Sequence, residues 1–481
     1  MISGREISSN LLWNLLERWG AQGVTFVVSI ILARILEPSA YGVVAMASVF
    51  TAILGVFIDS GLGSALVQKK DADDYDFSTV FFFNIAMCVF LYSVVFLSAP
   101  FIAKYYGMSD LTEVIRVSSL GLIISGFKNI FVSKIQKDLQ YKKFFYATLG
   151  GTIGAAVIGI SMAFMGYGVW ALVMQGLFNS AVDTIVLWIT VGWRPKVYFS
   201  WKRLKVLFPF GIRILMTYLV DAIYNKLRDL IIGKKYSPKD LAYYNKSSGW
   251  PNLIFANIGG AVDSVMFPVM SRVQEDKIQV RNIMSQIIRT NTYVVFPVLS
   301  GLALCSEPAV DLILTEKWLP MVEYMRIFCF SFACDSIINT QMNMIRSIGR
   351  SDLFLKINVI KKSIGLFALF ATMNISVRMI AYSLIFVKIF ELAINCAYVK
   401  RLLDFPLIEQ LYDFAPNALL CVAMAIPIVM ISQVSMTKST LLLSEIIIGS
   451  CTYILLSKIF NNENYRIVTK MVHDLIVRRK R

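Results

Sequence analysis

The chain has 481 residues, of which 57% are apolar or aromatic and only 16% are charged, and its formal net charge is +16. Soluble domains average about 45–50% apolar and about 25% charged residues, so this composition excludes an ordinary soluble protein and predicts an integral membrane protein. The Lys and Arg residues lie in short gaps between apolar runs. The positive charge therefore indicates membrane topology, and we expect no nucleic acid partner.

About 14 apolar stretches follow one another along the chain, each near the length of about 20 residues that a transmembrane helix needs. Their approximate bounds are 12–34, 41–67, 78–100, 114–135, 146–165, 169–191, 204–232, 241–271, 283–305, 321–345, 353–373, 378–400, 415–433 and 439–460. We therefore predict an all-α, polytopic membrane protein with about 14 transmembrane helices.

The gaps between these stretches differ in charge. Alternate gaps, together with the two ends of the chain, carry about three times as many Lys and Arg residues as the remaining gaps, and cytoplasmic loops are the ones enriched in these residues. We therefore predict that both termini lie in the cytoplasm.

An internal repeat occurs at an offset of about 200 residues. Residues 33–42 resemble residues 233–242, with Pro38 matching Pro238. Each copy holds six spans, an even number, so the copies are related by an axis along the membrane normal, as in transporters that bind substrate near the midplane. The predicted domains are an N-terminal lobe of six helices at 1–200, a C-terminal lobe of six helices at 201–405, two additional transmembrane helices at 406–460 and a basic cytoplasmic tail at 461–481.

Polar residues recur at helical spacing inside three of the spans. In the seventh span this stripe is Arg213, Thr217, Asp221, Tyr224 and Arg228. The first and tenth spans carry similar stripes, at Asn14, Arg18, Gln22, Thr25 and Ser29 and at Asp335, Asn339, Asn343 and Arg346. Steps of three and four residues place these side chains on one helix face, which a hydrated cavity accepts and lipid rejects.

Several Lys and Arg residues inside the apolar spans fall in the cytoplasmic half of their spans under the predicted topology. Unpaired cations in a cavity suit a phosphorylated or acidic substrate, because Arg binds phosphate oxygens in a bidentate manner and stays charged. The predicted substrate-binding residues are Arg18, Gln22, Lys128, Arg213, Arg228, Arg289 and Asn339. Asp59, Asp221 and Asp263 are candidates, by position alone, for coupling to protons or sodium. Structural ion pairing is the alternative for each charged residue.

Catalytic motifs are absent from the sequence. It contains no H-E-x-x-H, no Walker P-loop, no G-x-G-x-x-G between a strand and a helix, and no G-x-S-x-G. The only histidine, His473, lies in the polar basic tail. We therefore predict a protein that is not an enzyme, with no metal and no cofactor.

Two sequence runs, LARILEPSAYG at 32–42 and DSGLGSALVQ at 59–68, resemble the opening of bacterial polysaccharide flippases. The resemblance is to flippases of the O-antigen, colanic acid and teichuronic acid exporter type. These belong to the multidrug/oligosaccharidyl-lipid/polysaccharide superfamily, whose members have twelve or fourteen helices in two lobes. Further matches are DLIIG at 229–233, LAYYN at 241–245 and EKW at 316–318.

The resemblance implies a substrate, a mechanism and a location. The substrate would be an undecaprenyl-pyrophosphate-linked oligosaccharide, translocated across the bacterial cytoplasmic (inner) membrane by alternating access for O-antigen, capsule or exopolysaccharide synthesis. The implied partners are the lipid bilayer, a polysaccharide polymerase and other glycan-assembly proteins. Two alternatives stay open: an ion-coupled multidrug antiporter of the same superfamily, which would favour an acidic cavity, and a polytopic glycan-assembly enzyme.

Overall fold

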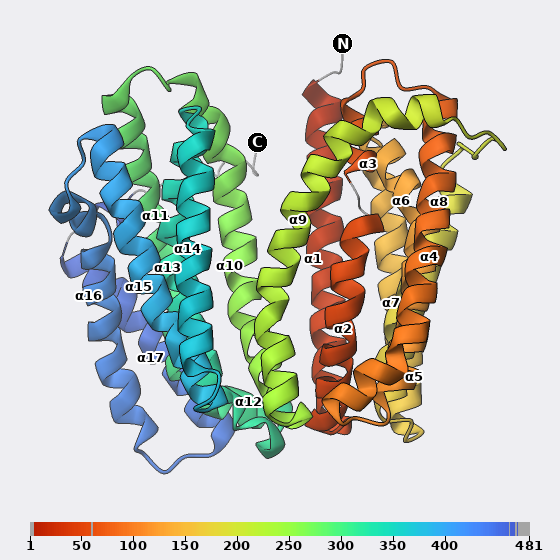
Figure 1. Cartoon of the computed structure of the whole chain (residues 1–481). Helices are drawn as coiled ribbons and strands as arrows, with labels where there is room; N and C mark the ends of the chain where they lie inside the picture. Colours follow the sequence, from red (N-terminus) through yellow and green to blue (C-terminus); the bar gives the residue numbers. More distant parts are fainter. Residues whose placement is uncertain (1–3, 59–60, 461, 467–468, 470–481) are drawn as a thin grey trace. The chain divides into compact units, whose positions relative to one another are not determined.

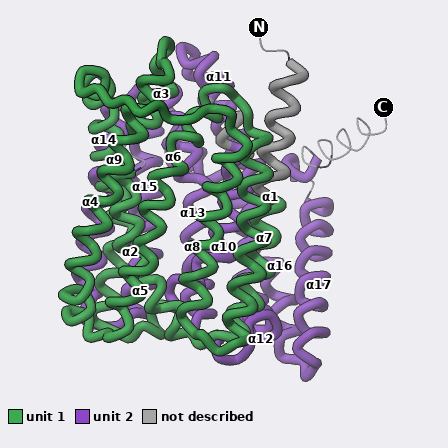
Figure 2. Tube along the Cα trace, turned by 90° about the vertical axis from the view of Figure 1, so that its right-hand side faces the viewer, with its two compact units in different colours: residues 1–242 green, residues 243–481 purple. Residues whose placement is uncertain are grey.

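The structure is a computed structural model that describes residues 4–58, 61–460, 462–466 and 469, and their side chains except those of residues 4–19, 261, 263–265 and 267. All regular structure in this part of the chain is helical (Figure 1). By its internal contacts the chain forms two compact units, residues 1–242 and residues 243–481 (Figure 2).

The first unit contains nine helices and the first residues of a tenth, as far as the described residues show. Their bounds are α1 Gly4–Ile35, α2 Pro38–Ile58, α3 Leu62–Gln68, α4 Asp74–Tyr106, α5 Leu111–Ser118, α6 Leu120–Asp138, α7 Lys142–Phe164, α8 Val169–Thr190 and α9 Trp201–Lys235. Within this unit α9 packs against α2, α3 and α4. The predicted lobes, 1–200 and 201–405, divide the chain at a different place, and they stay a prediction.

The second unit contains the remaining helices. Their bounds are α10 Pro238–Arg272, which starts in the first unit, α11 Lys277–Leu304, α12 Ser306–Leu314, the 3-10 helix η1 Glu316–Trp318, α13 Met321–Ser347, α14 Ser351–Thr372, α15 Val377–Leu403, α16 Leu407–Ser432 and α17 Lys438–Ile459. Here α11 and α15 pack on α13, α14 packs on α15, and α16 packs on α11 and α17.

Local sequence explains where many of these helices begin. Asp73 precedes α4 and forms a capping box with Asp76, in which each side chain accepts a hydrogen bond from the backbone N–H of the other. The Asp276 carboxylate likewise accepts two backbone N–H bonds at the start of α11. At the far end of α4, Gly107 has a φ of 70°, a left-handed conformation that glycine adopts without strain.

Within the described residues, nine helical segments are long and apolar enough to cross a membrane. They are α2 with α3, α4, α5 with α6, α7, α8, α9, α11, α16 and α17. Four further helices, α10, α13, α14 and α15, are 22 to 35 residues long but are not among these nine segments. The predicted count of about 14 spans stays a prediction.

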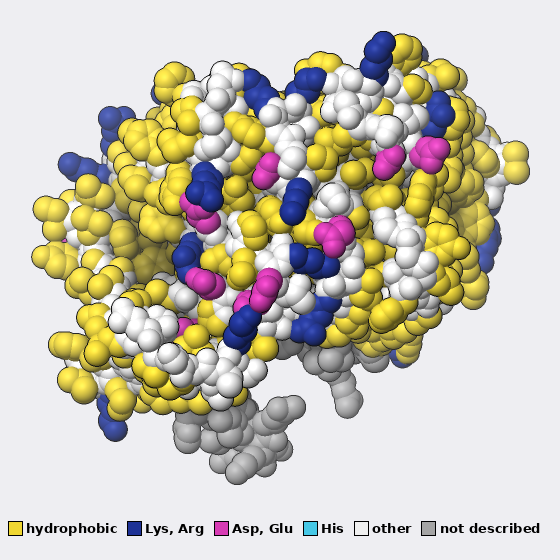
Figure 3. Space-filling view, turned by 90° about the horizontal axis from the view of Figure 1, so that it is seen from below, with side chains coloured by type: hydrophobic (Ala, Val, Ile, Leu, Met, Phe, Trp, Pro, Cys, Tyr) yellow, Lys and Arg dark blue, Asp and Glu magenta, His cyan; other side chains and the backbone are white. Residues whose placement is uncertain are grey.

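The distribution of apolar side chains fits a lipid environment. The first unit has an aromatic core in which Phe81, Phe131 and Trp193 pack between α4, α6 and the segment after α8. Many large apolar side chains nevertheless face outward, among them Phe101 and Ile189. Figure 3 shows one end of the molecule, where charged side chains of both signs lie among hydrophobic ones.

Candidate functional site

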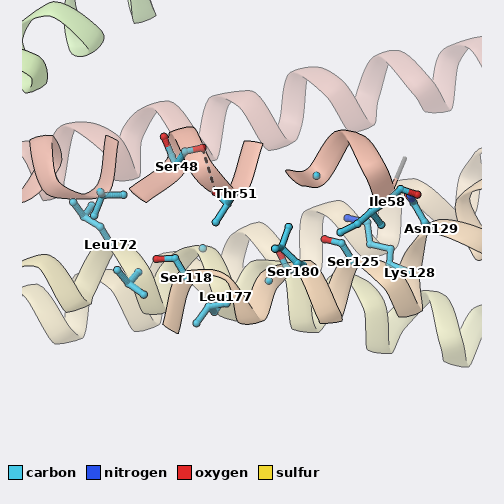
Figure 4. A pocket seen from close by; sticks show the side chains of 16 residues that line it. Ser48, Thr51, Ile58, Ser118, Ser125, Lys128, Asn129, Leu172, Leu177 and Ser180 are labelled. Atoms are coloured by element: carbon cyan, nitrogen blue, oxygen red, sulfur yellow. Dashed lines mark hydrogen bonds between the residues drawn. The ribbon is translucent and has the colours of Figure 1, made fainter. Parts of the chain in front are cut away.

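A cavity of about 470 Å³ lies inside the first unit, between α2, α5, α6 and α8. Its apolar walls include Val44, Leu122 and Leu172. Its polar lining, shown in Figure 4, is Ser48, Thr51, Ser118, Ser125, Lys128, Asn129 and Ser180. The polar part of the lining therefore consists mainly of hydroxyl groups, with one amide, one cation and no acidic side chain.

The hydroxyl groups of the lining fall into two kinds. Ser48 and Thr51 donate to backbone carbonyls of their own helix, Ser48 Oγ to Ala45 at 2.6 Å and Thr51 Oγ1 to Ser48 at 3.2 Å. Three other hydroxyls make no hydrogen bond with any residue that the structure describes; they belong to Ser118, Ser125 and Ser180. Each of these can donate one hydrogen bond and accept two, so the lining has unused capacity for a polar ligand.

Lys128 is the cation of the lining, and it is paired. Its Nζ lies 3.1 Å from Asp183 Oδ2; the Lys128 side chain is 30% exposed and that of Asp183 is 12% exposed. Gly151 of α7 packs so closely on Asp183 that an added Cβ would overlap Asp183 Oδ1. Asp183 thus lies behind the lining, held between α7 and Lys128. The expectation of an unpaired cation is wrong for Lys128, because its ammonium is paired with Asp183. The carboxylate offsets the cost of burying the ammonium.

Arg289 also differs from the expectation of an unpaired cation. In the second unit its Nε donates to Asp413 Oδ1 at 2.7 Å, and its Nη1 lies 3.6 Å from Glu463. Ser285 Oγ donates to the same Asp413 oxygen at 2.7 Å. Two carboxylates therefore neutralise this guanidinium.

The three predicted residues of α9 do not line the cavity in the first unit. Arg213 is exposed, and its guanidinium has no hydrogen bond or ion pair with any described residue. The Arg228 guanidinium lies 5.8 Å from the centre of the Tyr224 ring, a cation–π distance. Asp221 is half-buried.

The remaining predicted residues lie apart from the cavity or outside the described part of the chain. Gln22 is half-buried on α1 and is absent from the cavity lining, and Asn339 is exposed on α13 in the second unit. Asp59 and the side chains of Arg18 and Asp263 lie outside the described residues. Lys128 is thus the one predicted residue that the described structure places in this cavity. The assignment of substrate-binding and coupling roles to these residues stays a prediction.

The serines of the cavity were missed by sequence reasoning, although a signal for them exists. Ser118, Gly121, Ser125 and Lys128 follow one another at steps of three and four residues along α5 and α6. A search restricted to charged and amide side chains passes over such a stripe of small residues. Asp183, the partner of Lys128, is 55 residues away in the sequence, so no local pattern connects the two.

The sequence of the chain matches one protein family over residues 31–323, and that family is described as "Polysaccharide biosynthesis protein". Relatives match over similar lengths. The chain is 25% identical over 367 residues to an uncharacterized membrane protein in the cps region of Klebsiella pneumoniae, covering 73% of each chain. It is 21% identical over 357 residues to the lipopolysaccharide biosynthesis protein WzxC of Escherichia coli (strain K12), covering 72% of each chain.

Solved structures share the fold. The lipid II flippase MurJ in an inward closed conformation superposes with a TM-score of 0.78 at 16% identity, covering 95% of this chain and 100% of that one. A multidrug resistance MATE family transporter in an inward-facing conformation gives a TM-score of 0.61 at 13% identity, covering 79% and 94%. These likenesses confirm the predicted all-helical polytopic membrane fold.

The fold and the sequence matches define a multi-pass membrane transport protein, and not an enzyme. The chain belongs to the family of polysaccharide biosynthesis proteins, as its sequence motifs predict.

Proposed function

We propose that the chain translocates an undecaprenyl-pyrophosphate-linked oligosaccharide from the cytoplasmic to the outer leaflet of the bacterial inner membrane, for synthesis of a surface polysaccharide. The observation that carries this proposal is the cavity of the first unit, whose lining combines three unused hydroxyls with Lys128. Family membership supports it, since WzxC acts in lipopolysaccharide biosynthesis.

The chemistry of the cavity suits a glycan headgroup. Moving a sugar hydroxyl into hydrocarbon without a hydrogen-bond partner costs several kcal/mol, and an oligosaccharide carries many such groups. Serine hydroxyls replace water as partners because each can donate and accept. The cavity therefore lowers the barrier for the part of the substrate that lipid rejects, while the polyprenyl chain stays in the bilayer.

Lys128 gives the cavity an anchor for a negative group. Its ammonium has three N–H donors, and the single bond to Asp183 leaves the others for a phosphate or an acidic sugar. Asp183 balances the charge of Lys128 when no substrate is bound. The multidrug antiporter alternative would favour an acidic cavity, and the described lining of this cavity contains no Asp or Glu.

The route and its direction follow from the same proposal. Substrate enters from the cytoplasmic leaflet, and alternating access exposes it to the outer leaflet, where a polymerase uses it. Both termini lie in the cytoplasm in this arrangement. Arg18, Arg213 and Arg228 are proposed to contact the headgroup outside the cavity of the first unit.

The decisive experiment measures which leaflet holds the lipid-linked oligosaccharide in cells that lack the chain. We expect complete repeat units to accumulate on the cytoplasmic side and wild type to relieve the block. The double variant Ser125→Ala/Ser180→Ala, at equal membrane level, should relieve it several-fold less well. Ser93→Ala is the matched control, because Ser93 is an exposed serine of α4 that bonds only to the backbone of its own helix.

Two results would argue against the proposal. Normal sidedness in cells without the chain would show that the defect lies after translocation and would favour the glycan-assembly enzyme. Full relief by the double serine variant would show that the cavity is not part of the substrate path.

A further inference from the structure

Four ionisable side chains from three helices meet inside the second unit. We call Asp335 of α13, Lys361 of α14, and Lys388 and Glu391 of α15 the charge cluster. The Lys388 Nζ donates to Asp335 Oδ1 at 2.7 Å and to Glu391 Oε2 at 2.9 Å. Lys361 interacts electrostatically with all three of the others. Cys334, next to Asp335, also interacts electrostatically with Asp335, Lys388 and Glu391.

The charge cluster lies at the middle of its helices. Each member is at least ten residues from both ends of a helix whose bounds were given above. Ten residues of helix span about 15 Å, half the thickness of the hydrocarbon core. Where these helices cross the bilayer, the charge cluster therefore lies near its midplane, the most costly depth for charged groups.

A structural ion pair accounts for three of the four members. Lys388 is held by two carboxylates, so each buried charge of this trio has a hydrogen-bonded partner. Lys361 differs, because it is only 6% exposed yet its amine has no hydrogen bond or ion pair with any described residue. Packing alone would be served better by an apolar side chain at this position.

The net charge of the charge cluster depends on whether Lys361 is protonated. The trio of Asp335, Lys388 and Glu391 carries a net charge of −1 when ionised, and a protonated Lys361 brings the charge cluster to zero. Uptake of one proton at Lys361 therefore removes a net charge from the interior of the unit. Because α14 packs on α13 and α15, a shift of α14 changes the distance between Lys361 and the trio. The proton affinity of the amine depends on that distance.

We propose that the charge cluster is a proton-binding site, in which the Lys361 amine takes up one proton from water and returns it when α14 moves relative to α13 and α15. The nitrogen lone pair forms the new N–H bond on uptake, and the same bond breaks on release, so no other reactant is needed. The site is distinct from the cavity of the first unit and from Asp59, Asp221 and Asp263. What the bound proton drives rests on the proposed translocation function.

A pH jump tests the site without substrate. The full chain is reconstituted in liposomes on a solid-supported membrane. The measurement is the transient charge displacement after a step from about pH 8 to about pH 6, a range in which a buried lysine with a shifted pKa titrates. Wild type should give a transient. Lys361→Met should lose it, and so should Lys361→Arg, because a guanidinium keeps its proton throughout this range.

The matched control is Lys356→Met, which removes an exposed cation from the same helix and should keep the transient. Thermal unfolding of each variant shows whether it has folded, and Lys361→Arg preserves a cation where Lys361→Met removes it. A transient in folded Lys361→Met or Lys361→Arg equal to that of wild type would overturn the proposal.

The leaflet assay separates this proposal from the proposed function. A wild-type transient together with normal sidedness in cells without the chain would support the proton site and overturn translocation. Loss of the transient in Lys361→Met with full relief of the leaflet block would show that a proton binds but does not drive transport.

Discussion

At the scale of single residues, two charged side chains that look isolated in the sequence, Lys128 and Arg289, have partners in the structure. Lys128 meets Asp183 and Arg289 meets Asp413, across 55 and 124 positions of sequence. The depth of these residues in apolar spans was predictable from the sequence. Their partners were not, because pairing depends on the rotation and register of two helices that no local pattern records.

At one end of the first unit, Arg203 pairs with Asp73 and Asp76, and we expect this pairing to make the free energy of unfolding depend on pH. The Arg203 Nη1 lies 2.6 Å from Asp73 Oδ1 and 2.9 Å from Asp76 Oδ1. Partial burial raises the pKa of Asp73, but hydrogen bonds from the backbone N–H of Asp76 and from the Arg203 guanidinium lower it further, so this pKa lies below its usual value. Asp73 precedes α4 and lies outside the apolar spans.

We expect Asp73→Asn to unfold more easily than wild type near neutral pH, by about 0.5 kcal/mol because the pair is partly exposed. A depressed pKa gives stability that is present above the unfolded-state pKa of about 3.9 and is lost as pH falls through the lower folded-state value. The difference between wild type and Asp73→Asn should therefore narrow below about pH 4. Thermal unfolding in detergent across this range measures it.

Asp71→Asn serves as the comparison, since Asp71 is an exposed acid of the same loop. A constant difference between wild type and Asp73→Asn at every pH would show that Asp73 contributes only through its shape as a helix cap.

At the scale of helices, small residues decide how closely neighbours approach. An added Cβ at Gly42 of α2 would overlap the backbone carbonyl of Pro238, and one at Gly61 would lie 2.6 Å from the carbonyl oxygen of Gly211. Gly61 also has a φ of 61°, which side-chain-bearing residues rarely adopt. The sequence shows the glycines, but only the packed helices show which of them touch a neighbour.

The pair Gly150 and Gly151 of α7 allows a controlled test of such a contact. In Gly151→Ala the new methyl group displaces Asp183 and disturbs its ion pair with Lys128. We expect a loss of about 1–3 kcal/mol in the free energy of unfolding, the range for overpacking a close contact. Relief of the leaflet block should fall as well, since Lys128 lines the cavity.

Gly150→Ala is the matched control, because nothing lies within 4 Å of a Cβ added there. In a helix interior alanine is more favourable than glycine by about 1 kcal/mol in free energy. Gly150→Ala should therefore be as stable as wild type or slightly more stable. Equal destabilisation of both variants would mean that the contact with Asp183 does not matter.

At the scale of the whole molecule, the alternation of apolar spans and basic gaps sets the expected topology. The loop at residues 69–73 and the loop at residues 107–110 lie at opposite ends of α4, which is 33 residues long. A helix of that length spans about 50 Å, more than the hydrocarbon thickness. The two loops are therefore expected on opposite sides of the membrane. The loop at residues 69–73, which holds two lysines, is expected on the cytoplasmic side.

Cysteine labelling tests this topology in a Cys451→Ser background, which removes the exposed native thiol among those described. In intact cells a membrane-impermeant maleimide should label Ser109→Cys, and it should label Lys70→Cys only after permeabilisation. Both positions are exposed. The opposite labelling pattern would show that the topology is the reverse of the predicted one. The termini would then not lie in the cytoplasm.

The sequence by itself determined the class of this protein, because long apolar runs are stable only as helices in a bilayer and the motifs at helix ends identify the family. It also located Lys128 as a charge within a span. The tertiary structure decided which charges are neutralised and where a polar cavity forms. Those features arise where separate helices meet, so Ser125 and Ser180 become one lining only after α6 and α8 have packed against α2.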